Sequence, residues 1–216
     1  MIGKGLIRSA GADEWWQPGG VAAYAAWDSV GAASKAASLL DLTGNGRNIT
    51  ETGTVSWAGG VGWSGFTTSN YLRSGITPTP GVWSFFIRLN SALGGVNFHH
   101  FGYGNGTTLL ALTTFSSGSV NTLWRYGDTN TGLTKTSSPA EGVFGFADQE
   151  VYLDGTSLGT ITDTAPSTAI ELWIGVLNGS GTPQSPTNAN VQAFAIFDSK
   201  LSAGDAATLS TSMAGL

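Results

Sequence analysis

Short apolar stretches separated by turn residues make up most of the chain. From Tyr24 onward, Gly, Asn, Asp and Pro interrupt these stretches about every 8–12 residues, a spacing typical of a β-sandwich or barrel. The alternation is clearest at 83–89, where a strand places successive side chains on opposite faces. One face of this predicted strand carries Trp83, Phe85, Ile87 and Leu89, and the other carries Ser84, Phe86 and Arg88.

A compact meander is predicted in the second half of the chain. Strands are expected at 143–147, 150–153 and 157–161, joined by turns at Asp148-Gln149 and Asp154-Gly155. Further short strands are expected at 55–57, 60–63, 70–72, 109–115, 121–126 and 170–175. The Ala-rich segment 31–40 predicts either one helical turn or an irregular connection.

The chain is predicted to end in an interior strand followed by a capped helix. The strand covers 191–197 and is apolar on both faces, which is typical of a strand covered on both sides. Its two faces carry Val191, Ala193, Ala195 and Phe197 on one side, and Phe194 and Ile196 on the other. Ser202 is the expected N-cap with Asp205 at the capping-box position, and Ala206, Leu209 and Met213 share one helix face.

Composition narrows the picture to a turn-rich globular chain with few charges. Glycine occupies 32 of 216 positions, charged residues make up 11 %, and aromatic residues make up 11 %, including eight Trp. Disordered chains are charge-rich and poor in aromatics, so disorder is excluded. Long helices and coiled coils are rich in Ala, Glu, Lys and Leu, so they are excluded as well.

Residues 1–20 differ from the rest and are predicted to form a docking arm. The segment carries Leu6 and Ile7, followed by the pair Trp15-Trp16. Two exposed tryptophans are unfavourable in isolation, so we expect the arm to order on a partner or a neighbouring subunit. The alternative is an edge strand that packs both tryptophans on the chain's own core.

Charge, cysteine content and hydropathy exclude several classes of function. The net charge is −5 and no Lys/Arg run occurs, so no nucleic-acid partner is expected. The absence of cysteine excludes disulfides, thiolate zinc sites and thiol catalysis. Neither a signal peptide nor a membrane-spanning apolar run is visible, so we expect folding in the cytoplasm without membrane insertion.

The sequence contains few residues in arrangements suited to catalysis. Glycosidases need two carboxylates facing one cleft, and the nearest run here is Asp148-Gln-Glu150, with Asp154 further on. Both aspartates are predicted in turns, so glycoside hydrolysis is disfavoured. No G-x-S-x-G elbow occurs, and Gly102–Gly106 predicts a hairpin turn because it lacks the Lys-Ser/Thr of a phosphate loop.

No cofactor is expected, and calcium is the metal left as an alternative. His99 and His100 are adjacent, so on a strand they point to opposite faces and cannot chelate one ion. We expect them at the surface or at a loop edge. Calcium takes oxygen ligands, for which Asp128 and Asp163 are the loop candidates, with solvated turn aspartates as the alternative.

Sugar binding is compatible with the predicted loops. Lectin sites stack an aromatic ring on the sugar and satisfy its hydroxyls with Asn, Asp and backbone groups. The segment 178–190 carries turn signals and is long enough for a binding loop. The carbohydrate-binding candidates are Tyr103, Asn105, Trp124, Tyr126, Asp128 and Asn178.

Five short motifs follow one another in the order seen in a known family. They are Asp41-Leu-Thr-Gly-Asn-Gly-Arg-Asn48, Gly62-Trp-Ser-Gly-Phe with Asn70-Tyr-Leu72, Trp83-Ser-Phe-Phe-Ile-Arg88, Val151-Tyr-Leu-Asp-Gly155 and Phe194–Asp205. Together they resemble the laminin-G-like, concanavalin A-like jelly-roll module over about residues 24–214. The resemblance implies an all-β, antiparallel two-sheet jelly-roll sandwich with a short C-terminal helix, occupying 21–216 as one domain.

Short, cysteine-free chains of this kind with an N-terminal arm also resemble virion proteins of tailed bacteriophages. That resemblance implies a non-enzymatic structural protein: a capsid decoration protein, a head fibre or a tail receptor-binding protein. It implies a place on the virion surface after synthesis in the host cytoplasm, contacts with other virion proteins or copies of itself, and a surface glycan as a further partner. The alternative function is a stand-alone carbohydrate-binding lectin or adhesion module.

Overall fold

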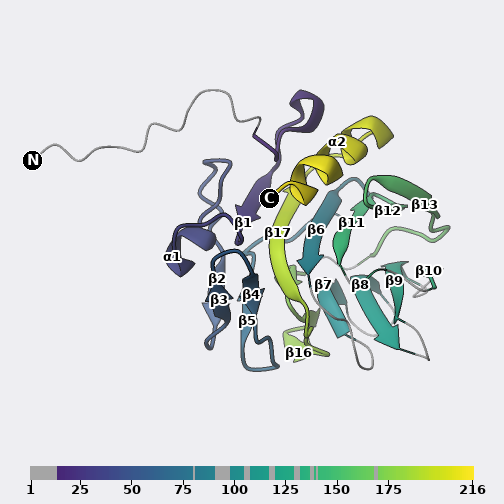
Figure 1. The fold of residues 1–216 in the computed structure, drawn as a ribbon. Coiled ribbons are helices and arrows are strands. Elements are labelled where there is room, and N and C mark those ends of the chain that lie inside the picture. The colour runs from purple at the N-terminus through teal and green to yellow at the C-terminus, as the bar shows by residue number, and fades with distance from the viewer. Residues whose placement is uncertain are drawn as a thin grey trace, which may run out of the picture.

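Two β-sheets face each other, and a C-terminal helix lies across the outer face of one of them (Figure 1). The computed structural model describes residues 14–79, 81–90, 98–104, 108–116, 120–128, 132–136, 139, 141–167 and 170–216. This architecture confirms the predicted antiparallel two-sheet sandwich with a short C-terminal helix. No helix within these ranges combines the length and apolar character needed to cross a membrane.

Sheet A contains the strand order β13-β12-β11-β6-β17-β4-β3, and β1 also pairs with β17. Its strands are β1 (Ala25–Asp28), β3 (Ser56–Ala58), β4 (Gly62–Ser64), β6 (Ser84–Asn90), β11 (Gly142–Ala147), β12 (Glu150–Leu153), β13 (Thr156–Thr160) and β17 (Asn190–Phe197). The predicted meander is confirmed as β11, β12 and β13. Its turns contain Asp148 and Asp154, both with positive φ.

Sheet B contains the order β10-β9-β8-β7-β14-β5-β2, and β15 pairs both with β16 and, in parallel, with β7. Its strands are β2 (Thr50–Thr52), β5 (Tyr71–Arg73), β7 (Phe98–Gly104), β8 (Leu109–Ser116), β9 (Val120–Gly127), β10 (Gly132–Lys135), β14 (Trp173–Ile174), β15 (Leu177–Gly179) and β16 (Thr182–Gln184). Two predictions are corrected here. Gly102 and Gly104 belong to β7, and the predicted loop 178–190 contains the β15–β16 hairpin.

The described part of the chain also contains three short helical segments: η1 (Pro18–Gly20), α1 (Lys35–Ser38) and α2 (Ala203–Ala214). The single turn of α1 is one of the two forms predicted for the Ala-rich segment. The cap of α2 is confirmed, because Ser202 Oγ accepts a hydrogen bond from Asp205 N at 3.2 Å. The predicted face of α2 is buried against sheet A.

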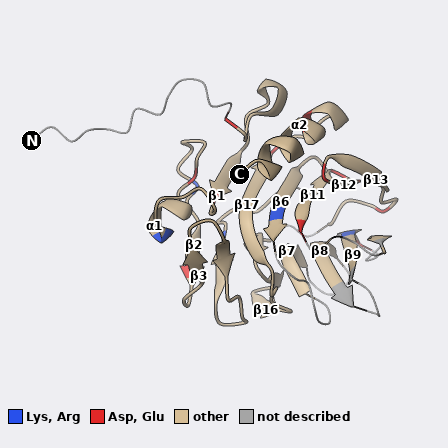
Figure 2. Cartoon of the chain, in the orientation of Figure 1, with Lys and Arg blue, Asp and Glu red and all other residues tan. Residues whose placement is uncertain are grey.

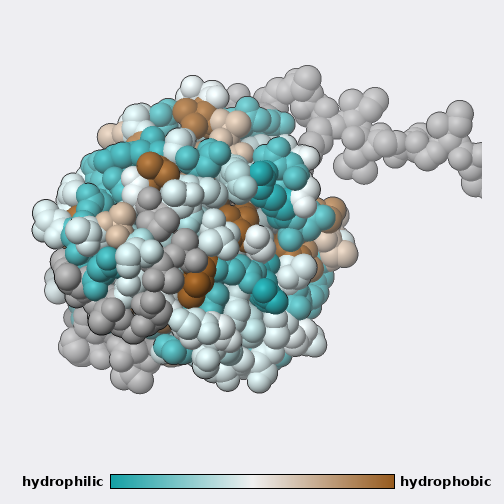
Figure 3. Space-filling view, turned by 180° about the vertical axis from the view of Figure 1, so that it is seen from behind, coloured by the Kyte–Doolittle hydropathy of each residue, from teal (hydrophilic) through white to brown (hydrophobic). Residues whose placement is uncertain are grey.

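The main core fills the space between the two sheets. The face of β6 that carries Phe85 and Ile87 points into this core, and sheet B contributes Phe101 from β7. Charged residues are sparse over both sheets in Figure 2, so the sandwich is stabilised mainly by apolar burial. From behind, the surface is mostly teal and white with small separate brown patches (Figure 3).

A second apolar cluster lies between sheet A and α2. It contains Phe86 of β6, Leu209 and Met213 of α2, and also Trp15 and Trp16. The two tryptophans are only 8 % and 4 % exposed. They therefore pack on the chain's own core, as the alternative to a docking arm predicted, although they form a turn there rather than an edge strand. Leu6 and Ile7 lie outside the described residues.

The motif that begins at Asp41 forms a loop tied to β1. The Asp41 carboxylate accepts hydrogen bonds from the backbone N–H groups of Ala26, Thr43 and Arg47, at 3.1–3.2 Å. The Arg47 guanidinium lies over the Tyr24 ring, 3.4 Å from its centroid, and donates to the Tyr24 carbonyl oxygen. This motif, one of the five that carried the family resemblance, thus stabilises the fold.

Replacing Asp41 with alanine should lower the free energy of unfolding by about 1.5–3 kcal/mol. Three backbone N–H groups lose a charged acceptor. A hydrogen bond to a charged group contributes about 1.5–3 kcal/mol to stability. Urea unfolding of the variant measures the change. Asp198→Ala is the matched control, because Asp198 is exposed; a loss at Asp41 no larger than the loss at Asp198 would contradict this account.

Candidate functional site

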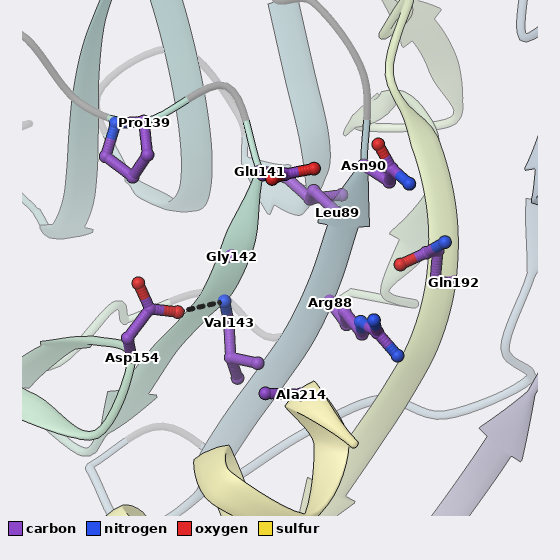
Figure 4. A pocket seen from close by; sticks show the side chains of 10 residues that line it. All are labelled: Arg88, Leu89, Asn90, Pro139, Glu141, Gly142, Val143, Asp154, Gln192 and Ala214. Atoms are coloured by element: carbon purple, nitrogen blue, oxygen red, sulfur yellow. Dashed lines mark hydrogen bonds between the residues drawn. The ribbon is translucent and has the colours of Figure 1, made fainter. Parts of the chain in front are cut away.

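A cavity of about 380 Å³ opens on the outer face of sheet A, beside the C-terminal end of α2 (Figure 4). Its volume falls within the range of small-molecule sites, roughly 300–1,000 Å³. The ten residues that line it are Arg88, Leu89, Asn90, Pro139, Glu141, Gly142, Val143, Asp154, Gln192 and Ala214. None of the ten is aromatic, so a ligand here meets hydrogen-bonding groups and aliphatic surface.

Strand alternation places Arg88 in this cavity. Phe86 points outward from β6 and is covered by α2, and Arg88 is the next outward residue, beyond the end of the helix. Its neighbours across the strands are Val143 on β11 and Ala193 on β17, which are smaller than arginine. The short neighbours and the end of α2 leave the space that the cavity occupies.

The Arg88 guanidinium has no partner within the described part of the chain. Its Nη1 atom is buried and makes no hydrogen bond, and neither of the ion pairs found in the described residues involves it. A buried cationic donor without a partner is unfavourable, and such groups are rare in folded proteins. Arg88 is therefore the strongest candidate for a ligand-binding residue in the cavity.

A β-bulge in β17 brings Gln192 to the same cavity. The register of β17 against β6 shifts between Val191 and Ala193, and Gln192 is the extra residue. Bulges redirect side chains in this way. The Gln192 side chain is buried, lines the cavity and makes one long hydrogen bond, from Nε2 to the Val61 carbonyl oxygen at 3.5 Å.

Two carboxylates lie at the exposed rim of the cavity. Glu141 precedes β11, and Asp154 lies in the turn after β12, where its Oδ1 accepts a hydrogen bond from Val143 N at 2.8 Å. A side chain at position 142 would clash with it, because a Cβ on Gly142 would lie 2.8 Å from Asp154 Oδ1 at a φ of +145°. Glycine at this position therefore lets the carboxylate lie against the strand.

Three aromatic candidates for sugar stacking lie inside the sandwich instead of at its surface. Tyr103, Trp124 and Tyr126 point between the sheets and belong to the main core. Burial raises the pKa of Tyr103, and the Tyr126 hydroxyl donates a hydrogen bond to Asp148. Their ring faces are covered by other core residues, so they cannot stack on a sugar at the surface. All three rings are buried because they occupy positions of their strands that point between the sheets.

The polar candidates have structural partners where the structure describes them. Asn178 is buried; its Nδ2 donates to the Glu171 carbonyl oxygen, and its Oδ1 accepts from Gly181 N, both at 2.7 Å. Its amide is thus committed to the fold rather than to a ligand. Asn105 lies outside the described residues.

The calcium candidates Asp128 and Asp163 lie near each other but do not form a metal-binding cluster. Hydrogen bonds from Ser167 N and the Thr108 hydroxyl lower the pKa of Asp128. Repulsion from Asp163 opposes this shift. Among the described residues, no group of three or more His, Asp or Glu side chains is placed to hold a metal ion. Calcium binding at these aspartates stays a prediction.

The two histidines are buried, which corrects their expected surface position. His100 is fully buried, with Nε2 3.0 Å from Thr114 Oγ1 and Nδ1 2.8 Å from Thr187 Oγ1. Burial lowers its pKa to about 3. Burial and the nearby Arg125 lower the pKa of His99 to about 4. Both are neutral at physiological pH and belong to the fold rather than to a metal site.

Comparison with solved structures identifies similar folds. Domain 4 of AbnA, a GH43 extracellular arabinanase from Geobacillus stearothermophilus, in complex with arabinotriose, matches with a TM-score of 0.61 and 16 % identity. That match covers 86 % of this chain and 97 % of the domain. The chain shares this β-sandwich fold. At this identity the likeness shows the fold alone.

Two further solved structures match parts of the chain. Trypanosoma rangeli sialidase in complex with 2,3-difluorosialic acid matches with a TM-score of 0.58 and 13 % identity, over 86 % of this chain but 32 % of the longer sialidase. The CBM40 of a Ruminococcus gnavus sialidase, bound to α2,3-sialyllactose, matches with a TM-score of 0.46 and 15 % identity, over 61 % of this chain and 84 % of the other. No family model matches the chain, and no curated protein matches it.

Proposed function

We propose that this chain is a non-enzymatic carbohydrate-binding module whose ligand occupies the Arg88 cavity. The observation that carries the proposal is the cavity itself, which combines an unpartnered guanidinium with two carboxamides and two carboxylates. Sugar hydroxyls both donate and accept hydrogen bonds, so they match a lining that offers donors and acceptors together. The fold shared with an arabinanase domain that was solved with arabinotriose supports the same function.

The positions and hydrogen bonds of the carboxylates favour a binding role over catalysis. Asp154 is bonded to the backbone of β11 and Glu141 is exposed at the rim, and Figure 4 shows that the two do not face each other across the cavity. Asp148 and Glu150 are also engaged, since they accept hydrogen bonds from Tyr126 and Ser157. A glycosidase needs two carboxyl groups flanking one bond.

Filling the cavity should weaken sugar binding strongly. Ala214 is exposed and lines the cavity at the end of α2, so Ala214→Trp places an indole in the ligand's space without disturbing the core. We expect calorimetric titration of a panel of neutral and acidic oligosaccharides, including arabinotriose, to show saturable binding for the unmodified chain. Binding should weaken by at least about tenfold in the variant, which corresponds to about 1.4 kcal/mol.

Ala203→Trp is the matched control, because Ala203 is exposed at the other end of the same helix. It should bind like the unmodified chain. Equal weakening by both variants would assign the effect to α2 stability, and no binding to any member of the panel would overturn the proposal. The same mixtures should release no new reducing ends, since release would indicate a hydrolase.

A place on a tailed-phage virion is the finer form of this proposal and rests on the sequence resemblance. In that setting the sandwich would present the Arg88 cavity outward from a particle. Docking through Trp15 and Trp16 would first require their release from the cluster under α2, where both are buried. Docking to a virion through Trp15 and Trp16 would thus cost the free energy of removing both side chains from this cluster. A stand-alone lectin would not have this cost.

A further inference from the structure

We propose that the Arg88 cavity selects a sugar that carries a carboxylate, with the carboxylate seated on Arg88 and Gln192. This inference rests on the proposed carbohydrate-binding function and specifies the class of sugar. Its basis is the arrangement of charge by depth: the cationic group lies inside the cavity and the anionic groups lie at its mouth.

The inner end of the cavity offers hydrogen-bond donors. Arg88 is half-buried and its Nη1 is fully buried without a partner. Gln192 is 3 % exposed, and its Nε2 directs one hydrogen toward Val61, which leaves the other available. Figure 4 shows both side chains on the β17 side of the cavity. A group that enters the cavity therefore meets the Arg88 guanidinium and the Gln192 carboxamide on this side.

Nearby acidic side chains leave Arg88 without a counter-ion. Glu141 and Asp154 line the same cavity from the β11 side, yet neither forms an ion pair with Arg88. Asp154 is held away by its hydrogen bond to Val143 N. Because neither carboxylate is paired with it, the Arg88 guanidinium is available to bind an anionic group of a ligand.

A carboxylate fits this site better than a hydroxyl. A hydroxyl satisfies the hydrogen bond of Nη1 but leaves the guanidinium charge uncompensated. A carboxylate satisfies both, and its two oxygens match the planar fork of arginine. The rim carboxylates are then suited to accept hydrogen bonds from the ring hydroxyls of the same sugar. The geometry thus favours a uronic acid whose acid group points inward.

Matched sugar pairs test the inference. D-Glucuronate and D-glucose differ by a carboxylate in place of a hydroxymethyl group, as do D-galacturonate and D-galactose. For at least one pair, NMR-detected titration of the full chain should give a uronate affinity at least about tenfold above that of the neutral partner, the range expected for charge-assisted hydrogen bonds. Added sodium chloride should weaken uronate binding and leave neutral-sugar binding unchanged.

Substitutions at two residues should shift this preference in opposite directions. Arg88→Gln removes the charge and should make the uronate and its neutral partner bind equally, while Arg88→Lys should retain part of the preference. Glu141→Gln removes a like charge from the exposed rim but keeps a side-chain oxygen that accepts hydrogen bonds from sugar hydroxyls. It should therefore strengthen uronate binding by about two- to threefold and leave neutral-sugar binding nearly unchanged. Thermal melting of each variant separates these effects from loss of folding.

The outcomes distinguish this inference from the proposed function beneath it. Equal binding of acidic and neutral partners by the unmodified chain, or a uronate preference that survives Arg88→Gln, would overturn the carboxylate assignment and leave carbohydrate binding intact. Failure of every sugar, acidic or neutral, to bind would overturn both.

Discussion

Truncation of Phe101 to alanine should lower the free energy of unfolding by about 3–5 kcal/mol, the usual cost of removing a buried Phe side chain. Phe101 belongs to sheet B and is 0 % exposed. Its ring lies 5.1 Å from Phe194 and 6.1 Å from both Phe85 and Phe146, all measured between ring centroids, and those three belong to sheet A. Removal of this ring therefore leaves a cavity between the sheets.

Urea or thermal unfolding followed by tryptophan fluorescence measures the effect, and an exposed residue provides the control. Val82 is 45 % exposed, so Val82→Ala should change the free energy of unfolding by no more than about 0.5 kcal/mol. A loss of less than about 1 kcal/mol for Phe101→Ala would show that the sheets are held together elsewhere than in this aromatic cluster.

Local patterns were sufficient to predict most strands of sheet A, although β1 was not predicted. The Asp-containing turns of the meander and the alternation of β6 depend on neighbouring residues, and both are confirmed. The capped helix is confirmed for the same reason, since Ser202 and Asp205 lie three residues apart. Such signals are visible in the sequence because the contacts that produce them are local.

Sheet B was predicted less well because the glycines within β7 were interpreted as turn residues. Gly102 and Gly104 made this segment resemble a turn, yet a Cβ on Gly102 would lie 2.5 Å from the Leu110 carbonyl oxygen of β8. Glycine is required there by the close approach of two strands rather than by a turn. Because β7 was missed, Tyr103 was assigned to a loop and the histidines to the surface, whereas all three are buried.

The cavity was not predicted because it joins residues far apart in the sequence. Arg88, Asp154 and Gln192 come from three separate strands or turns, and α2 closes one side. The bulge at Gln192 also moves Val191 to the core side, which corrects the predicted face of β17. A signal was nevertheless present: Arg88 is the one charged residue in the predicted strand 83–89, whose other residues are apolar apart from Ser84.

The stability of the fold should fall by roughly 4 kcal/mol between pH 7 and pH 5, because two histidines are buried in neutral form. The native pKa values of His99 and His100 are about 4 and about 3, below the value of 6.5 for an unperturbed histidine. The unfolded chain therefore binds protons first as the pH drops. Stability is fully present above about pH 6.5 and is lost below it, by roughly 2 kcal/mol for each histidine at pH 5.

The free energy of unfolding in urea, measured across this pH range, tests the prediction, and glutamine substitutions assign the effect to its source. His99→Gln and His100→Gln should each remove about half of the pH dependence, whatever their effect on stability at pH 7. Carboxyl groups titrate mainly below this window and contribute little to it. Two results would contradict the burial of neutral histidines. In one, both variants lose as much free energy of unfolding between pH 7 and pH 5 as the unmodified chain. In the other, NMR shows either histidine titrating near pH 6.5 in the native protein. His100 is the more decisive of the two, since it is fully buried and the hydroxyls of Thr114 and Thr187 already satisfy both ring nitrogens of its neutral form.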